Sequence, residues 1–305
     1  MLIKILGSAA GGGFPQINCN CRNCADVRQR KPGLSPRTQS SLAVSRDGNA
    51  WALLNASPDL RQQIAQTPTL APRAETGLRD SPIKAVVLTN GDVDHIAGLL
   101  SLREGFAFAL HASQRVLDTL AANSVFKVLD PGRVPRMALE AGQAAKLDLG
   151  LTVEALAVPG KIALYLEDPA AGRSLGTQDG DTIGLKVADQ TSGAAFFYIP
   201  GCAGVDETLA ARLRGAQLVL FDGTLYSDDE MVAQGLSGKT GKRMGHISMS
   251  GADGAIAAFR HLGVERRVFV HINNSNPVLR ENSPERAEVE KAGWEVAYDG
   301  MEISL

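Results

Sequence analysis

Short apolar runs with strand-like alternation dominate the hydrophobic pattern of this chain, and segments with helical spacing separate several of them. Such runs predict strands because they are brief, apolar and bounded by turn-forming residues. The predicted strands cover residues 2–6, 41–44, 51–54, 83–88, 106–111, 151–158, 163–166, 183–187, 195–199, 218–221, 267–271, 294–298 and 301–304. The predicted helices cover residues 58–66, 96–103, 113–122, 206–213, 252–262 and 284–292.

Strand-rich and helical segments alternate in both halves of the chain, and no linker rich in Pro, Gly or Ser divides them. The helix at 252–262 has an apolar face, which indicates packing against a sheet. We therefore expect a single α/β domain over residues 1–305, built as an αββα four-layer sandwich. Two separate α/β domains are the alternative. The segment 127–149 has the least regular pattern and is interpreted as an insertion or a lid.

Composition places the chain among folded globular proteins. Of its 305 residues, 44% are hydrophobic and 21% are charged, which is enough for a sizeable core. The net charge of −2 argues against a main role in binding nucleic acid. No apolar run approaches the ~20 residues that span a bilayer, and the short N-terminal run is more typical of a strand than of a signal peptide. We therefore expect a cytoplasmic enzyme.

Three of the four cysteines, Cys19, Cys21 and Cys24, form a Cys-x-Cys-x-x-Cys motif. Thiols this close in a cytosolic chain predict a metal site, and structural zinc needs four ligands in a tetrahedron. The fourth ligand must then come from elsewhere, such as a His or Asn near the C-terminal strand. Unmetallated thiols or a redox pair are the alternatives, although no adjacent helix start is evident in the sequence. Cys202 is interpreted as a buried apolar residue.

The loop that follows the predicted strand 83–88 is the second candidate site. It carries Asp92, Asp94 and His95, and ligands in α/β folds are commonly held where strands end. Two carboxylates and an imidazole suit a hard or borderline metal ion. The alternative is that Asp92 or Asp94 only caps the following helix.

The third candidate group lies late in the chain, where Asp222 and His271 end predicted strands and His246 precedes a helix. His95, His246 and His271 are three of only five histidines, and their similar placement favours a shared pocket. Scattered surface groups are the alternative. His111 and His261 are interpreted as structural residues.

These motifs resemble the metallo-β-lactamase superfamily, whose signature loop reads His-x-His-x-Asp-His. In this chain Asn90 and Asp92 replace the two leading histidines, Asp94 and His95 are kept, and His271 matches the last ligand. The resemblance implies the metallo-β-lactamase fold. It also implies that two expected ligands are missing, because 158–161 holds no His and 198–202 holds no Asp.

The cysteine motif resembles the structural zinc loop that a subset of this superfamily carries. We expect the loop at about 11–24 to bind zinc through its three cysteines, and Asn274 is the expected fourth ligand. Asn274 follows His271 by three residues, where relatives with this motif place a His. Such an exposed, stiffened loop is also a candidate homodimer contact.

Longer motifs narrow the resemblance further. The runs GSAAGGGFPQINCNC, NASPDLRQQI, LTNGDVDHIAGLLSLRE, FDGTLYSDDEM, GHISMSG and HINNSNP extend over the whole chain. Together they resemble the family of coenzyme PQQ (pyrroloquinoline quinone) synthesis protein B. That resemblance implies one of two roles: an oxygen-using, iron-dependent hydroxylase acting on a tyrosine-derived precursor, or a carrier that assists transport of PQQ or its precursor to the periplasm.

The remaining ligand set favours the hydroxylase. Asp94, His95 and His271 supply two histidines and one carboxylate, the set used by non-haem iron oxygenases. We expect one mononuclear Fe(II) site that uses O₂ to hydroxylate a Glu-Tyr-type precursor, with Asp92 as an extra ligand or as a partner of the His95 ring. His246 and Asp222 would act as proton donor and acceptor over the open face.

Three cationic residues before His246, namely Lys239, Lys242 and Arg243, are expected to face the pocket and hold substrate carboxylates. The alternative is a solvated loop. Two other functions stay open besides the hydroxylase and the carrier: a metal-dependent hydrolase, which would usually need two metal ions, and a non-catalytic binding partner.

Overall fold

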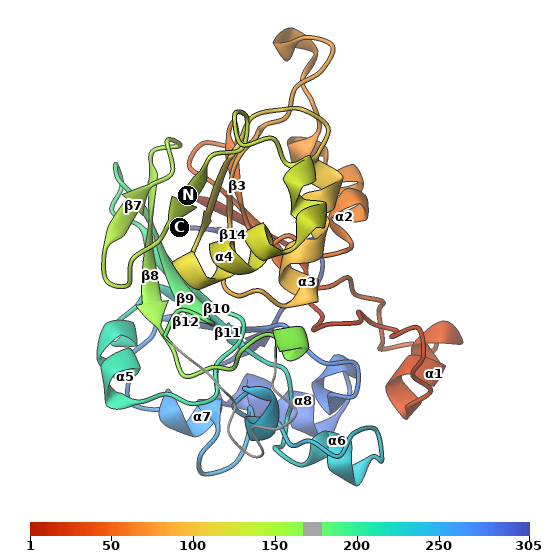
Figure 1. Ribbon diagram of the computed structural model, residues 1–305. Helices are drawn as coiled ribbons and strands as arrows, with labels where there is room; N and C mark the ends of the chain where they lie inside the picture. The colour runs from red at the N-terminus through yellow and green to blue at the C-terminus, as the bar shows by residue number, and fades with distance from the viewer. Residues whose placement is uncertain (167–178) are drawn as a thin grey trace.

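The computed structural model describes residues 1–166 and 179–305. Its strands form two seven-stranded sheets (Figure 1). The first sheet has the order β14 (Glu302–Ser304), β1 (Leu2–Gly7), β2 (Ser41–Ser45), β3 (Trp51–Leu54), β4 (Ile83–Val87), β5 (Ala109–Ala112) and β6 (Arg136–Ala138). The second has the order β13 (Glu295–Val296), β12 (Arg266–Val270), β11 (Leu218–Asp222), β10 (Ala195–Ile199), β9 (Ile183–Asp189), β8 (Leu151–Ala157) and β7 (Ala144–Lys146).

Helices cover the outer face of each sheet, with α2, α3 and α4 on one side of the molecule in Figure 1 and α5, α7 and α8 on the other. The α-helices are α1 (Arg22–Arg28), α2 (Leu60–Gln66), α3 (Val93–Ile96), α4 (Gln114–Ala122), α5 (Glu207–Leu213), α6 (Glu230–Ala233), α7 (Ala255–Ala258) and α8 (Pro284–Lys291). Short 3₁₀ helices are η1 (Pro68–Leu70), η2 (Ala74–Thr76), η3 (Ala97–Leu102), η4 (Ser124–Val128), η5 (Leu164–Leu166), η7 (Lys242–Met244) and η8 (Pro277–Leu279). Within the described ranges, each helix is too short or too polar to cross a bilayer.

Strand β11 shows why the layers stack as they do, because both of its faces are apolar. Leu218 and Leu220 join a core between the two sheets, whereas Val219 and Phe221 join a second core under the helices α5, α7 and α8. Successive side chains on a strand point to opposite faces, so an unbroken apolar run suits a strand covered on both sides. A third core lies between the first sheet and its helices. The predicted αββα sandwich is confirmed.

The strands that position the candidate site are parallel to their neighbours. Strand β4 pairs in parallel with β3 and β5, and β11 pairs in parallel with β10 and β12. The carboxyl ends of parallel strands meet at one edge of a sheet, which is where α/β proteins commonly hold ligands. Residues that follow β4, β11 and β12 are therefore brought close together.

Two sequence expectations about the middle of the chain are wrong. The segment 163–166 is not a strand: its last three residues form the single 3₁₀ turn η5, in which Tyr165 and Leu166 are partly exposed. The segment 127–149 is not a lid, because it contains β6 and β7, which form the outer edge of each sheet. Edge strands of three residues carry too little alternation to stand out in a sequence.

Two helices also differ from expectation. The predicted helix 252–262 is reduced to the one turn of α7, which starts after Gly254, and the chain turns at Gly263 with φ of 64°. Helix α1 was not predicted, although it begins at Arg22, inside the cysteine motif. It is drawn in red at the side of the molecule in Figure 1. The absence of a helix start is therefore no argument against redox chemistry at these thiols.

Candidate metal centres

A carboxylate and two imidazoles converge where strands β4 and β12 end. Asp94 and His95 lie in α3, after β4, and His271 directly follows β12. Asp94 Oδ2 lies 3.1 Å from His271 Nε2 and 3.7 Å from His95 Nε2. The three candidate ligand atoms lie within 4.8 Å of one another. We call Asp94, His95 and His271 the histidine centre.

Asn90 orients the first of these imidazoles. His95 Nδ1 lies 2.7 Å from Asn90 Oδ1, and the backbone N–H of Asp92 donates to the same oxygen at 3.0 Å. Because a backbone N–H only donates, the shared atom is the amide oxygen, and His95 Nδ1–H donates to it. His95 Nε2 is then the unprotonated nitrogen. It is buried and makes no hydrogen bond with the described residues, which fits a bound divalent cation.

Thr224 orients the second imidazole in the same way. The Thr224 hydroxyl donates to Asp222 Oδ1 at 2.7 Å, so it accepts from His271 Nδ1 at 2.9 Å. His271 Nε2 is thereby left to face Asp94. His271 also has a backbone φ of 56°, in the left-handed region that non-glycine residues seldom adopt. Such strained positions concentrate at ligand sites.

Burial penalises every charge in this centre, and the contacts between the groups decide which of them stay charged. Burial opposes ionisation of Asp94, but the rings of His95 and His271 hold its pKa well below the usual range. For His95, burial outweighs the attraction of the Asp94 carboxylate and lowers the pKa of the imidazole to about 4. For His271, the hydrogen bond to Asp94 overcomes burial and raises the pKa. Near neutral pH, Asp94 and His95 are already in the protonation states that metal ligands require.

His246 and Asp222 form a second pair beside His271. His246 Nδ1 lies 2.7 Å from Asp222 Oδ2, which also accepts the backbone N–H of Cys202 at 2.9 Å. Asp222 is fully buried, and the His246 ring stacks on the His271 ring with centroids 5.4 Å apart. A carboxylate held in this way fixes the tautomer and the direction of the His246 ring, leaving Nε2 for proton transfer. The structure thus brings together the residues predicted as proton donor and acceptor.

Asp92 lies outside the histidine centre in this structure, so its predicted role as an extra metal ligand gains no support from the geometry and stays a prediction. Its Oδ1 lies 3.4 Å from Lys161 Nζ. Three groups of side chains in the described ranges could hold a metal ion, namely Cys19–Cys21–Cys24, Asp94–His95–His271 and Asp222–His246–His271, and Asp92 belongs to none of them. Asp92 has extended backbone just before α3, whereas Asp94 is already helical, so their side chains diverge. The His95 ring N–H that Asp92 was expected to hold is bonded to Asn90 instead.

A cavity of about 470 Å³ opens over the histidine centre and gives it access to small molecules. Its walls combine the candidate ligands with cationic and apolar side chains. The lining residues are Ala10, Gly11, Gln16, Asn90, Asp92, Asp94, His95, Lys161, Thr224, Met231, Ser237, Lys239, Met244, His246, His271 and Asn273.

Of the three cations predicted to hold substrate, only Lys239 lines this cavity. Lys242 lies elsewhere: its Nζ is 3.5 Å from Asp253 Oδ2, and it lines a separate hollow with Ala203 and Asp253. Arg243 is not among the lining residues. The single turn η7 sends successive side chains in different directions, so neighbouring cations in the sequence do not share one wall.

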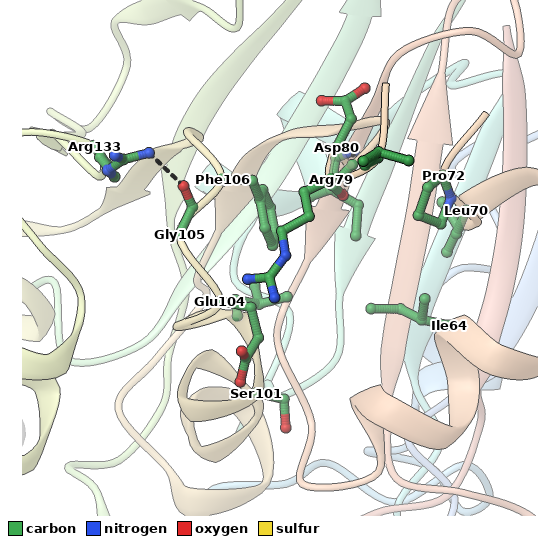
Figure 2. A pocket seen from close by; sticks show the side chains of 14 residues that line it. Ile64, Leu70, Pro72, Arg79, Asp80, Ser101, Glu104, Gly105, Phe106 and Arg133 are labelled. Carbon is green, nitrogen blue, oxygen red and sulfur yellow. Dashed lines mark hydrogen bonds between the residues drawn. The ribbon is translucent and has the colours of Figure 1, made fainter. Parts of the chain in front are cut away.

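A larger hollow of about 770 Å³ shares no lining residue with this cavity. Figure 2 shows its walls. Ile64, Leu70 and Phe106 give it apolar walls, and Arg79 and Glu104 reach into it. None of its lining residues belongs to a metal-ligating cluster. The 470 Å³ cavity over the histidine centre is therefore the better candidate for an active site, although it is smaller than this hollow.

The predicted cysteine site is assembled in the structure. The sulfur atoms of Cys19, Cys21 and Cys24 lie within 4.8 Å of one another, and we call them the thiol cluster. Asn274 Nδ2 lies 3.1 Å from Cys19 Sγ, 3.3 Å from Cys24 Sγ and 3.6 Å from Cys21 Sγ. A 180° turn of this amide would present its oxygen to the same point. The geometry fits a tetrahedral zinc with Asn274 as the fourth ligand.

The thiols differ in how readily they ionise. Burial raises the pKa of Cys24 to about 11, whereas Cys19 has a lowered pKa because hydrogen bonds, led by that of the Cys21 backbone N–H, outweigh burial. A bound zinc ion would need all three groups as thiolates, so its binding would release the proton of Cys24.

The structure also shows contacts of three residues whose roles the sequence did not predict. Asn90 was read as a lost ligand, but it holds a ligand in place. Lys161 lies in the segment where a third histidine was missing, and it reaches the cavity. Glu230 is buried beneath the segment 271–276, where Ser275 Oγ donates to it at 2.5 Å. A single Lys after a turn, or one residue of a short acidic run, carries no sequence signal for such a place.

Comparisons with known proteins agree with this geometry. The family model described as beta-lactamase superfamily domain matches residues 50–272, so fold and site define a member of that superfamily. The chain is 52% identical to coenzyme PQQ synthesis protein B of Xanthomonas oryzae and 50% identical to that of Methylobacterium radiotolerans, with full coverage of both chains. It also superposes on the crystal structure of zinc-bound PqqB from Methylobacterium extorquens, with a TM-score of 0.96, 50% identity and full coverage. The chain belongs to the family of coenzyme PQQ synthesis protein B.

Proposed function

We propose that this protein acts in PQQ synthesis as a mononuclear, iron-dependent oxygenase that hydroxylates a tyrosine-derived, Glu-Tyr-type precursor. The observation that carries the proposal is the histidine centre itself, in which two imidazoles and one carboxylate converge beside a cavity. This is the ligand set of non-haem iron oxygenases, which leave further positions open. The zinc-bound relative supports metal binding by the family but does not identify the working metal.

The residues that replace the two leading histidines of the superfamily motif disfavour a second metal ion on their side of the centre. Asn90 and Asp92 occupy the positions of two histidines in the superfamily motif, and they contact His95 and Lys161 respectively. A hydrolase of the usual two-metal type needs a second ion to hold the attacking hydroxide. A lysine ammonium beside Asp92 opposes a second cation at that place.

The protein side of the reaction falls to the residues around the cavity. Iron(II), when bound, would supply the redox chemistry that activates O₂. Asp222 holds Nδ1 of His246, and His246 lines the cavity, which supports a role for its Nε2 in taking the phenol proton or returning one. Met231 and Met244 give the wall an apolar surface for the aromatic ring.

The test is anaerobic loading with Fe(II), followed by O₂, ascorbate as reductant and a Glu-Tyr peptide. Each hydroxylation adds one oxygen atom to the ring and releases the other as water, which consumes two electrons and two protons from the reductant. We expect a product heavier by oxygen atoms. The variants His95→Ala and His271→Ala should abolish it, whereas His261→Ala, an exposed histidine outside the site, should retain it.

Equal turnover with zinc would contradict the oxygenase. An unmodified peptide under all conditions, together with tight binding of PQQ, would favour the carrier instead.

A further inference from the structure

Lys161 places an ammonium group inside the cavity, next to the histidine centre. Its side chain is only 15% exposed, and its Nζ lies 3.4 Å from Asp92 Oδ1. Both residues line the same cavity as Asp94, His95 and His271. A lysine this well covered is uncommon unless its charge has a partner.

Neighbouring residues hold Lys161 in this position. The Thr182 hydroxyl donates to the Lys161 carbonyl at 2.9 Å, and Thr182 is bridged to Asn90. The stem of the side chain lies against Gly245, where a Cβ would come within 2.8 Å of Lys161 Cγ. Gly245 also has φ of 85°, so its missing side chain serves both the turn and the lysine. These contacts hold the ammonium group in the wall of the cavity that His246 also lines.

The contacts of the ammonium are longer than strong ionic hydrogen bonds. Among the described residues its oxygen neighbours are Asp92 Oδ1 at 3.4 Å and the Ile162 carbonyl at 3.5 Å, whereas charge-assisted bonds usually measure about 2.7–2.9 Å. An ammonium offers three donors. Lys161 therefore keeps capacity for a stronger acceptor that enters the cavity.

We propose that Lys161 binds a carboxylate of the ligand and so sets its register over the histidine centre. The ligand class is a carboxylate-bearing, amino-acid-derived molecule, a choice that rests on the proposed function. Binding such a carboxylate is the role that the sequence predicted for Lys239, Lys242 and Arg243, of which Lys242 and Arg243 are not among the residues that line the cavity. With the carboxylate at the Asp92 end, the rest of the ligand extends toward His246 and His271, which line the same cavity.

Binding to the zinc-loaded protein without oxygen tests this role separately from turnover. The probes are the Glu-Tyr dipeptide and its two monoamides, one at the C-terminal carboxyl and one at the glutamate side chain. We expect Lys161→Met to weaken binding of the dipeptide roughly 10–100-fold, the effect of losing a hydrogen bond between charged groups. One monoamide should bind the wild-type protein about as weakly as the dipeptide binds Lys161→Met. The Lys161→Met variant should bind that monoamide and the unmodified dipeptide with equal affinity.

Lys242→Met is the matched control, because it removes a lysine that pairs with Asp253 outside the cavity, and it should keep full affinity. Lys161→Arg should recover part of the binding, which a purely structural role would not require. Zinc content and circular dichroism check that each variant is folded.

Undiminished binding by Lys161→Met, or an unchanged preference of that variant for the dipeptide over both monoamides, would overturn the proposal. So would a wild-type protein that binds none of the probes. Because this experiment measures binding and not hydroxylation, its result can be interpreted even if the oxygenase assay fails.

Discussion

The thiol cluster and the histidine centre lie at the two ends of one short segment, His271 to Asn274, yet they are built differently. The thiol cluster takes three ligands from six consecutive positions, so a local loop almost completes it. The histidine centre joins Asp94 to a residue 177 positions later, so only the folded sheets create it. The Asn274 amide contacts all three sulfur atoms of the thiol cluster, whereas a cavity opens over the histidine centre. Closed sites serve structure and open ones serve chemistry.

The two sites also differ in whether a metal ion must displace protons from its ligands. Cys24 has a pKa raised to about 11, so metal binding at the thiol cluster must remove a proton at neutral pH. Asp94 has a pKa well below its usual range, and that of His95 is about 4, so these ligands are already deprotonated. Their geometry is prepared by Asn90 and Thr224 before a metal arrives.

The largest effect is expected from Cys21→Ser, which removes one ligand of the closed site. It should release about one zinc per chain, because structural zinc needs a full tetrahedron, while most secondary structure is kept. Metal analysis and circular dichroism measure both results. Cys202→Ala, a buried cysteine outside the cluster, is the control and should keep its zinc. Full zinc content in Cys21→Ser would show that the cluster is not the zinc site.

A smaller effect is expected from the two asparagines, each of which serves one centre. Asn90→Ala frees the His95 ring and should lower metal affinity at the histidine centre roughly 10–100-fold, as loss of a ligand-orienting contact does. Asn274→Ala should weaken zinc binding at the thiol cluster alone. Competition with a chelator measures both affinities, and each variant is the control for the other. Equal weakening of both centres by either change would break the distinction between them.

The smallest effect on either metal is expected from Glu230→Gln. Glu230 is buried beneath the segment 271–276, which carries His271 and Asn274. Burial raises the pKa of Glu230 to about 7. Between about pH 5 and 7 the folded protein keeps a proton that the unfolded chain has lost, so stability falls as pH rises through that window. Glu230→Gln should flatten this decline in urea unfolding, with Glu75→Gln, an exposed glutamate, as control. An unchanged pH profile would contradict a protonated Glu230.

The sequence predicted most strands because central strands such as β11 are apolar on both faces and stand out clearly. It failed at β6 and β7, whose three residues pair at sheet edges and are partly exposed. It failed again at α1, where cysteines and charged residues hide the helical spacing. Tertiary pairing, not local pattern, decides these elements.

The candidate ligands were predicted because strand ends and the superfamily motif both pointed to them. Their supporting contacts were not predictable, since they depend on side-chain directions across the fold. Asp92 and Asp94 are two residues apart, yet one meets Lys161 and the other meets His271. In the same way Lys242 and Lys239 diverge within one loop. Spacing in a sequence does not tell which wall a side chain faces.

The pairing of β1 with β14 bears on how the protein is made. Leu2 lies opposite Ser304, so β1 completes its pairing only with residues synthesised about 300 positions later. Contacts of such long separation form slowly, and unpaired strand edges invite association in the meantime. His271 also emerges late, after both sheets have most of their strands. During translation the chain therefore carries an incomplete histidine centre until the residues after β12 have left the ribosome, and an open edge of the first sheet until β14 has done so.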